Sequence, residues 1–172
     1  MAFGKFGKYH PNGANYRPEI VDLVEELATT IDQFKDNEGQ KHQINFTTDT
    51  DSCELYTDPL HLKYIIVNLL QNAAKYSHEA SEIDVTLATR DAQPWFVVCD
   101  QGIGVPQDEL DELFSPFYRA SNVADRSGTG MGLPIVKQSA RLIGATVSAS
   151  SEEGQGSVFT VKLPGRKGRP PA

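Results

Sequence analysis

Residues 68–77 read NLLQNAAKYS, and three of their polar side chains recur at helical spacing. Asn68, Asn72 and Lys75 are separated by four and three positions, which places them within roughly 60° of arc on one face of an α-helix. Carboxamide oxygens can bind a hard cation and an ammonium group can meet phosphate, whereas the plainer alternative is a solvated polar face. A second, apolar stripe would face a core: Leu62, Ile65, Ile66, Leu69 and Ala73.

The residues around this stretch predict an alternation of helices and strands. Asp58-Pro59 is a helix start, because the aspartate can cap free amides and proline wastes no hydrogen bond at the first helical position. Apolar periodicity predicts helices at residues 19–34, 59–76, 106–114 and 133–143. Candidate strands lie at residues 42–47, 54–57, 83–89, 95–99, 146–150 and 157–163. The Gly- and Ser-bearing stretch 115–132 has little periodicity, and a loop of that length inside a domain is usually functional or mobile.

Composition narrows the class of protein. The chain of 172 residues is 39% hydrophobic and 23% charged, which fits one globular domain with a full core. A net charge of -7 argues against nucleic acid as a partner but does not forbid ATP, whose phosphates can be met locally. No apolar run approaches the roughly 18 residues of a membrane span, so we expect no membrane contact by this chain. Two distant cysteines and no signal peptide favour the cytoplasm.

The ends of the chain differ in composition from its centre. Residues 1–17 are rich in Gly, Asn and basic residues, and we interpret them as a flexible leader or an artificial remnant. Residues 165–172 form a basic, Pro- and Gly-rich tail that we expect to be disordered. Residues 18–164 would then form the single domain.

The sequence DQGIG follows directly on the apolar run WFVVC. Gly102 and Gly104 would let the backbone approach a planar ligand, and the Asp100 carboxylate can accept a hydrogen bond from an exocyclic amine. Adenine carries such an amine where guanine carries a carbonyl, so this aspartate would select adenine. An ordinary Asp-Gly turn is the alternative.

A second glycine motif, SGTGMGL at residues 127–133, leads into a predicted helix. Glycines before a helix present free amides and the positive end of the helix dipole to phosphate. The motif is neither a Walker A loop nor a Rossmann fingerprint. Taken alone, it is equally compatible with a flexible linker.

Five motifs occur in order: NLLQNAAKYS, DQGIG, SPFYR (residues 115–119), SGTGMGL and EGQGSVF (residues 153–159). The series resembles the catalytic ATP-binding domain of sensor histidine kinases, in the superfamily that includes gyrase, Hsp90 and MutL. The resemblance covers about residues 19–164. It implies a two-layer α/β sandwich of the Bergerat type, with a mixed sheet of about five strands, three main helices on one face and a mobile ATP lid.

The resemblance also implies roles for individual residues. Asn72 would be the Mg²⁺ ligand, Asp100 would select adenine, and Phe117 and Arg119 would begin the lid, the first by packing and the second by reaching a phosphate. No residue is assigned with certainty as catalytic. The implied ATP-binding residues are Asn68, Asn72, Lys75, Tyr76, Asp100, Gly102, Gly104, Phe117, Arg119, Gly128, Thr129, Gly130, Gly132, Leu133 and Ser157.

Asn68 bears on the reaction, because hydrolytic members of the superfamily have a water-activating glutamate there. A carboxamide has no useful basicity, which suits a kinase that passes the γ-phosphoryl group to another protein. The resemblance implies a histidine acceptor on a separate helical domain, in cis or in trans, and a downstream response regulator. His78-Glu79 follows the central helix and is not expected to be the acceptor.

Other functions remain open from the sequence alone. One is a serine kinase of the anti-sigma-factor type, a second is a non-catalytic nucleotide-sensing module, and a third is an ATPase, which Asn68 disfavours. We expect a monomer, because dimerisation in this family uses helices that this chain lacks. The chain would be cytoplasmic, either alone or as the cytoplasmic part of a larger, membrane-bound sensor.

Overall fold

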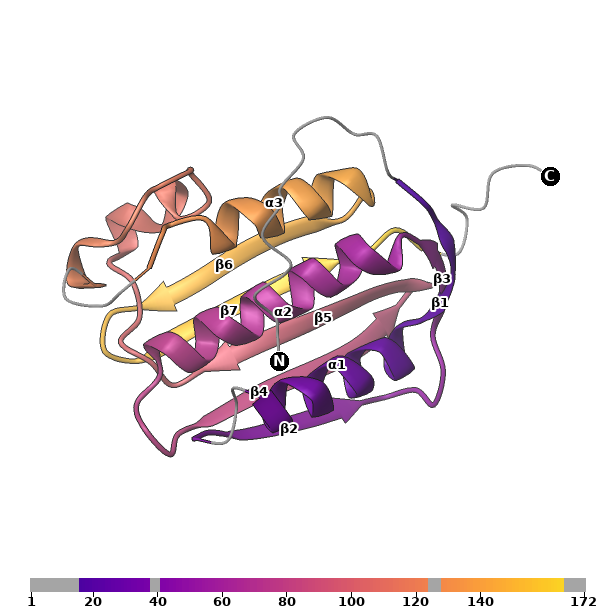
Figure 1. Ribbon diagram of the computed structural model, residues 1–172, viewed down its shortest axis with the longest axis horizontal. Coiled ribbons are helices and arrows are strands. Elements are labelled where there is room, and N and C mark those ends of the chain that lie inside the picture. Colours follow the sequence, from indigo (N-terminus) through magenta and orange to yellow (C-terminus); the bar gives the residue numbers. More distant parts are fainter. Residues whose placement is uncertain (1–15, 38–40, 124–127, 166–172) are drawn as a thin grey trace.

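The computed structural model describes residues 16–37, 41–123 and 128–165, and its helices cover one face of a sheet (Figure 1). The predicted leader, apart from its last two residues, and nearly all of the predicted tail lie outside these residues. The elements in chain order are β1 (Glu19–Asp22), α1 (Leu23–Asn37), β2 (Gln43–Thr48), β3 (Glu54–Thr57), α2 (Pro59–Tyr76), β4 (Glu82–Arg90), β5 (Gln93–Asp100), the 3-10 helices η2 (Gln107–Glu112) and η3 (Ser121–Val123), α3 (Gly132–Leu142), β6 (Thr146–Glu152) and β7 (Gly156–Lys162).

The main sheet has five strands in the order β2-β4-β5-β7-β6. β2 runs parallel to β4, and the other neighbours are antiparallel, so the sheet is mixed. α1, α2 and α3 lie together on one face, with α2 across the middle (Figure 1). The expected α/β sandwich, with about five strands and three main helices, is therefore confirmed.

α2 begins where the sequence predicted and forms the centre of the core. Asp58 caps its first turn, accepting hydrogen bonds from the backbone N–H of Leu60 at 2.9 Å and of His61 at 3.3 Å. The apolar stripe of the helix is fully buried. Because that stripe occupies one side, the polar side chains of the helix are left to line another surface.

The strands bury one face and leave the other more open. In β4, the side chains of Ile83, Val85 and Leu87 are buried, whereas Glu82 before them and Asp84 between them are exposed. β5 alternates in the same way around Phe96 and Val98. This period of two directs the apolar side chains of the central strands toward the helices.

The predicted helix at residues 19–34 is wrong at its start, because residues 19–22 form β1 and pair with β3. The Asp22 carboxylate accepts hydrogen bonds from the N–H of Val24 at 2.9 Å and of Cys53 at 3.1 Å. It therefore caps α1 and also ties the preceding strand to the chain before β3. β1 and β3 make a separate two-stranded sheet.

The predicted helix at residues 106–114 is replaced by the 3-10 helix η2. Its sequence, QDELDE, contains no buried residue. An α-helix in a protein is stabilised mainly by packing of an apolar face, and this segment has none to pack. Within the described ranges, no helix is long and apolar enough to cross a membrane.

Candidate functional site

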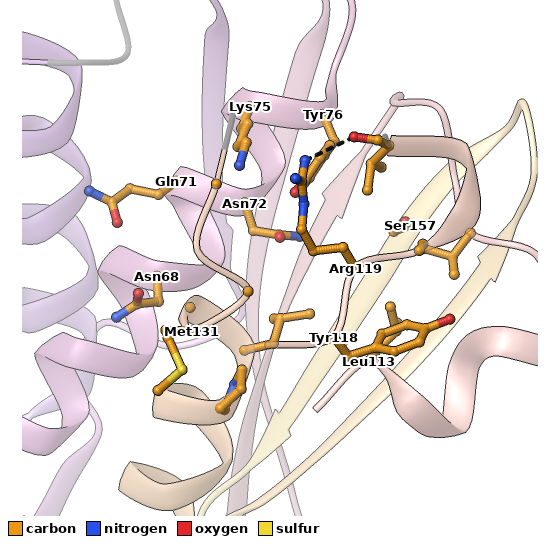
Figure 2. Close-up of a pocket in the computed structure, with 18 of the residues that line it drawn as sticks. Asn68, Gln71, Asn72, Lys75, Tyr76, Leu113, Tyr118, Arg119, Met131 and Ser157 are labelled. Carbon is orange, nitrogen blue, oxygen red and sulfur yellow. Dashed lines mark hydrogen bonds between the residues drawn. The ribbon is translucent and has the colours of Figure 1, made fainter. Parts of the chain in front are cut away.

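A pocket of about 400 Å³ opens between α2, the loop after β5, the segment after η2 and the start of α3 (Figure 2). It brings together side chains from motifs that are far apart in the sequence. Of the predicted ATP-binding residues, all but Gly102 and Phe117 line it: Asn68, Asn72, Lys75, Tyr76, Asp100, Gly104, Arg119, Gly128, Thr129, Gly130, Gly132, Leu133 and Ser157.

α2 supplies the polar wall of the pocket (Figure 2). Nδ2 of Asn68 donates to the Tyr64 carbonyl at 2.7 Å, and Oδ1 faces Gly132, where a Cβ would lie 3.5 Å away. The Lys75 ammonium lies 5.1 Å from the centre of the Tyr76 ring and beside Gly128, where a Cβ would lie 2.0 Å from Nζ and would displace the ammonium. The helix thus presents one fixed carboxamide oxygen and one cation to the same cavity.

Asp100 is the buried carboxyl of the site, with 4% of its surface exposed at the end of β5. Burial raises its pKa to about 6, although hydrogen bonds from the backbone N–H of Gly102 and Ser157 oppose the rise. The Gly102 N–H is 2.9 Å from Oδ1. A buried acceptor with few donors around it is suited to receive the N–H of a ligand.

The two glycines of DQGIG serve different purposes. A Cβ on Gly102 would lie 2.5 Å from the Tyr76 carbonyl oxygen and 2.7 Å from Oδ1 of Asp100, so this residue packs behind the site and does not line it. Gly104 lines the pocket and has φ +66, a left-handed conformation that favours glycine. A Cβ on Gly104 would lie 2.0 Å from the Glu152 carbonyl oxygen, so this glycine is also required by packing. The expectation that the glycines admit the base does not fit Gly102 and stays a prediction for Gly104.

Phe117 does not pack as expected. Its side chain is 75% exposed, and its backbone has φ 63. The Phe117 N–H donates to the Gly130 carbonyl at 3.1 Å, which joins the two ends of the lid segment. Left-handed backbone at this residue turns the ring outward, and the next aromatic, Tyr118, lines the pocket instead.

Arg119 reaches the pocket but is engaged within its own segment. Its guanidinium donates to the Val123 carbonyl at 3.0 Å (dashed line in Figure 2). This hydrogen bond holds the guanidinium beside the cavity that it lines.

The segment after η2 is attached to that helix through Glu109. The carboxylate accepts hydrogen bonds from the Tyr118 hydroxyl at 2.6 Å and from the Ser121 N–H at 2.8 Å, and a short one from the Ser121 hydroxyl. Hydrogen bonds from Ser121 and then Tyr118 hold the pKa of Glu109 below its usual value, and the bond to Glu109 raises the pKa of Tyr118 to about 12. We call these three residues the Glu109 anchor.

Sequence reasoning missed several residues of the pocket. Gln71 is three positions after Asn68, so helical spacing could have found it. The apolar lining carried no such signal, because these residues follow no period and are brought in only by the path of the loop and α3. They are Val105, Leu113, Ala120, Val123, Met131, Pro134, Ile135 and Phe159.

Comparison with known proteins places this geometry in a family. The family model described as histidine kinase-, DNA gyrase B-, and HSP90-like ATPase matches residues 57–167, which include the whole pocket. The chain belongs to this family. Membership in this family implies ATP binding.

Similar proteins include several sensor histidine kinases. Sensor histidine kinase YkoH of Bacillus subtilis is 36% identical over 152 residues, which is 87% of this chain and 33% of YkoH. WalK of the same organism is 27% identical over 93% of this chain and 27% of its own length. A solved structure of the mycobacterial sensor histidine kinase MprB superposes with a TM-score of 0.76 at 26% identity, over 87% of this chain and 99% of that one. The chain thus spans about a third or less of the curated relatives named here.

Proposed function

We propose that this chain is the Mg-ATP-binding catalytic domain of a two-component sensor histidine kinase, which donates the γ-phosphoryl group to a histidine on a separate helical domain. The observation that carries the proposal is the pocket itself. The buried Asp100 carboxylate, which could accept a hydrogen bond from the amine of adenine, lines one cavity together with the polar face of α2 that carries the carboxamides and Lys75. The relatives that share this domain are named sensor histidine kinases.

Asn68 supports transfer over hydrolysis. Its carboxamide is held by the Tyr64 carbonyl and turns its oxygen toward Gly132. An amide oxygen cannot take a proton from water at neutral pH, so this position does not supply a general base. A bound triphosphate would therefore persist until an acceptor arrives.

The residues around the pocket fit a magnesium ion that arrives with the nucleotide. In the described part of the chain, no group of three or more His, Cys, Asp or Glu side chains could hold a metal by itself. Mg²⁺ is commonly held by one or two protein oxygens together with substrate phosphates and water. Asn72 would provide that oxygen, and the metal would neutralise charge on the phosphates.

Phosphate binding would combine two cations with backbone amides. Lys75 and Arg119 line the cavity from opposite segments, α2 and the lid. α3 has no side-chain cap at Met131, so the amides of its first turn, at Gly132 and Leu133, are left to face the pocket. Uncapped amides at a helix start are a recurring phosphate site. Catalysis would rest on positioning and charge neutralisation.

The partners that this function requires are a histidine-bearing helical domain, supplied in cis or in trans, and a response regulator that receives the phosphoryl group. The isolated chain is proposed to be a monomer. Residues 18–164 would act as one domain, in the cytoplasm or on the cytoplasmic side of a longer sensor.

Calorimetric titration of the purified chain with ATP, with and without Mg²⁺, tests the nucleotide site. ATP should bind more tightly with Mg²⁺, and GTP should bind weakly or not at all, because its carbonyl would face the Asp100 carboxylate. Asn72→Ala should remove the effect of Mg²⁺ on ATP affinity, since no oxygen would be left to complete the metal's ligands. Asn72→Asp, which keeps that oxygen, is the matched control.

Two results would overturn the proposal. The first is the absence of ATP binding to the native chain under either condition. The second is equal affinity for ATP and GTP, which would mean that Asp100 does not select the base. A magnesium effect that survives Asn72→Ala would overturn only the assignment of the metal ligand.

A further inference from the structure

Two serine hydroxyls lie in contact behind the base-selecting side of the pocket. Ser151 in β6 and Ser157 in β7 are direct cross-strand partners, and their Oγ atoms are 2.8 Å apart. Both side chains are buried, with 8% and 7% of their surfaces exposed. Ser157 is also the cross-strand partner of Asp100 on its other side, and these two residues line the pocket.

The partners of Ser151 determine which hydroxyl gives its proton to the other. The Val105 N–H, 2.8 Å from the Ser151 oxygen, can only donate. The Gly156 carbonyl, also 2.8 Å away, can only accept, so it receives the single Ser151 proton. A hydroxyl has one proton and two lone pairs, and the remaining lone pair of Ser151 faces Ser157. Ser157 must therefore donate to Ser151.

We propose that Ser151 is a positioning residue that makes Ser157 a hydrogen-bond acceptor toward the pocket, and thereby contributes to the choice of adenine. This inference rests on the proposed nucleotide site. The Ser157 proton is committed to Ser151, so only lone pairs of Ser157 remain for a ligand. Together with the Asp100 carboxylate, the wall then offers acceptors alone.

A wall of acceptors distinguishes ligands by the group at one position. An exocyclic amine brings two N–H donors, which two acceptors can satisfy. A carbonyl at the same position brings two more lone pairs and would leave buried acceptors facing each other, which is unfavourable. Without Ser151, the Ser157 hydroxyl could rotate and donate to such a carbonyl. The selectivity would then rest on Asp100 alone.

The test compares ATP with inosine triphosphate, which has the carbonyl in place of the amine. Dissociation constants for both are measured by calorimetry on the full chain and on Ser151→Ala. The ratio of the inosine triphosphate constant to the ATP constant should fall about three- to tenfold in the variant, the range of one neutral hydrogen bond. Ser150→Ala, in the exposed neighbour on β6, should leave the ratio unchanged.

Ser151 also holds the Val105 N–H, so a purely structural effect must be separated from the proposed one. Loosening of the loop would weaken both nucleotides by the same factor and leave their ratio unchanged, and that result would overturn the proposal. Ser151→Cys is a second variant, of similar shape to the native residue. Because a thiol is only a weak donor and acceptor, the ratio of the inosine triphosphate constant to the ATP constant should fall in this variant as well. Failure of the native chain to bind ATP would instead overturn the proposed function.

Discussion

Burial of the Asp100 carboxyl lowers the stability of the fold at neutral pH and also provides a hydrogen-bond acceptor for a ligand. Its pKa is about 6 in the folded protein and has an ordinary value of 3.8. The folded chain therefore binds more protons than the unfolded chain between these values. Stability falls as pH rises through this window, and the full cost is present above about pH 6. A shift of this size corresponds to on the order of 2–3 kcal/mol.

We expect Asp100→Asn to be at least as stable as the native chain at pH 7 and to bind ATP more weakly. The carboxamide removes the buried charge but also removes one acceptor of the base, at a cost of about 1.5–3 kcal/mol in binding. Denaturant unfolding and calorimetry measure the two effects. A variant that binds ATP with native affinity would contradict the adenine assignment.

The pH dependence of ATP binding is a second test of the role of Asp100. Native affinity for ATP should decline as the pH falls below about 6, where the Asp100 carboxylate gains a proton. The nucleotide itself also titrates, so the difference between the native chain and Asp100→Asn is the informative quantity. That difference should shrink toward acid pH.

At the same scale, the sequence could predict some site residues and not others. Asn68, Asn72 and Lys75 share one helix face, and helical spacing alone places them together. Asp100 was found because it ends an apolar strand and precedes glycines. Ser151 and Glu109 had no such signal. The Val105 N–H that bonds Ser151 is 46 residues away, and the Ser121 N–H that bonds Glu109 is 12 residues away. The resemblance implied that Phe117 packs, but this residue has a left-handed backbone and its side chain is 75% exposed.

Among the elements, the described part of the segment between η2 and α3 is attached to its surroundings by a set of side-chain and backbone hydrogen bonds. The Glu109 anchor attaches its first half to η2, and the bond from the Phe117 N–H to the Gly130 carbonyl joins its two ends. η2 itself buries no side chain. The Glu109 carboxylate therefore helps to position Tyr118 and Arg119 at the pocket, together with the hydrogen bond from the Asn122 side chain to the Gly104 carbonyl.

We expect Glu109→Gln to loosen this segment without lowering global stability. A neutral amide accepts weaker hydrogen bonds than a carboxylate, so the Tyr118 hydroxyl and the Ser121 N–H would be held less firmly. Hydrogen exchange should become faster at the Ser121 amide, and ATP affinity should fall. Asp111→Asn removes one negative charge from the same 3-10 helix and serves as the control. Native exchange at Ser121 in Glu109→Gln would show that the anchor does not hold the segment.

Element prediction succeeded where packing and periodicity agreed. α2 was predicted within its observed bounds because a cap, a proline and an apolar stripe all indicate the same helix. β1 was missed because Ile20 and Val21 continue the apolar period of α1, and only the pairing with β3 makes them a strand. An α-helix was predicted at residues 106–114 from their pattern, but the segment forms the 3-10 helix η2, which has no buried face.

For the molecule as a whole, the proposed function separates donor chemistry from acceptor chemistry. The pocket is lined by the proposed base-selecting residues, by Lys75 and Arg119, and by the uncapped start of α3. Asn68 offers no base, and the acceptor histidine is proposed to lie on another domain. His78, the histidine that directly follows α2, is exposed in the turn before β4 and is not among the pocket residues. The chain should therefore bind ATP and hydrolyse it little until an acceptor domain is present.

This arrangement predicts transfer in trans or in a fusion protein, with little hydrolysis by the chain alone. A histidine-bearing helical domain, fused before residue 16, would supply the acceptor at high effective concentration. Radiolabelled γ-phosphoryl should appear on that domain as an acid-labile phosphate and should be lost when its histidine is replaced by alanine or when Asn72→Ala is introduced in the donor. An acid-stable label would indicate a serine kinase, because phosphohistidine is acid-labile. Release of inorganic phosphate without any label would indicate an ATPase, and would mean that some group other than Asn68 activates water.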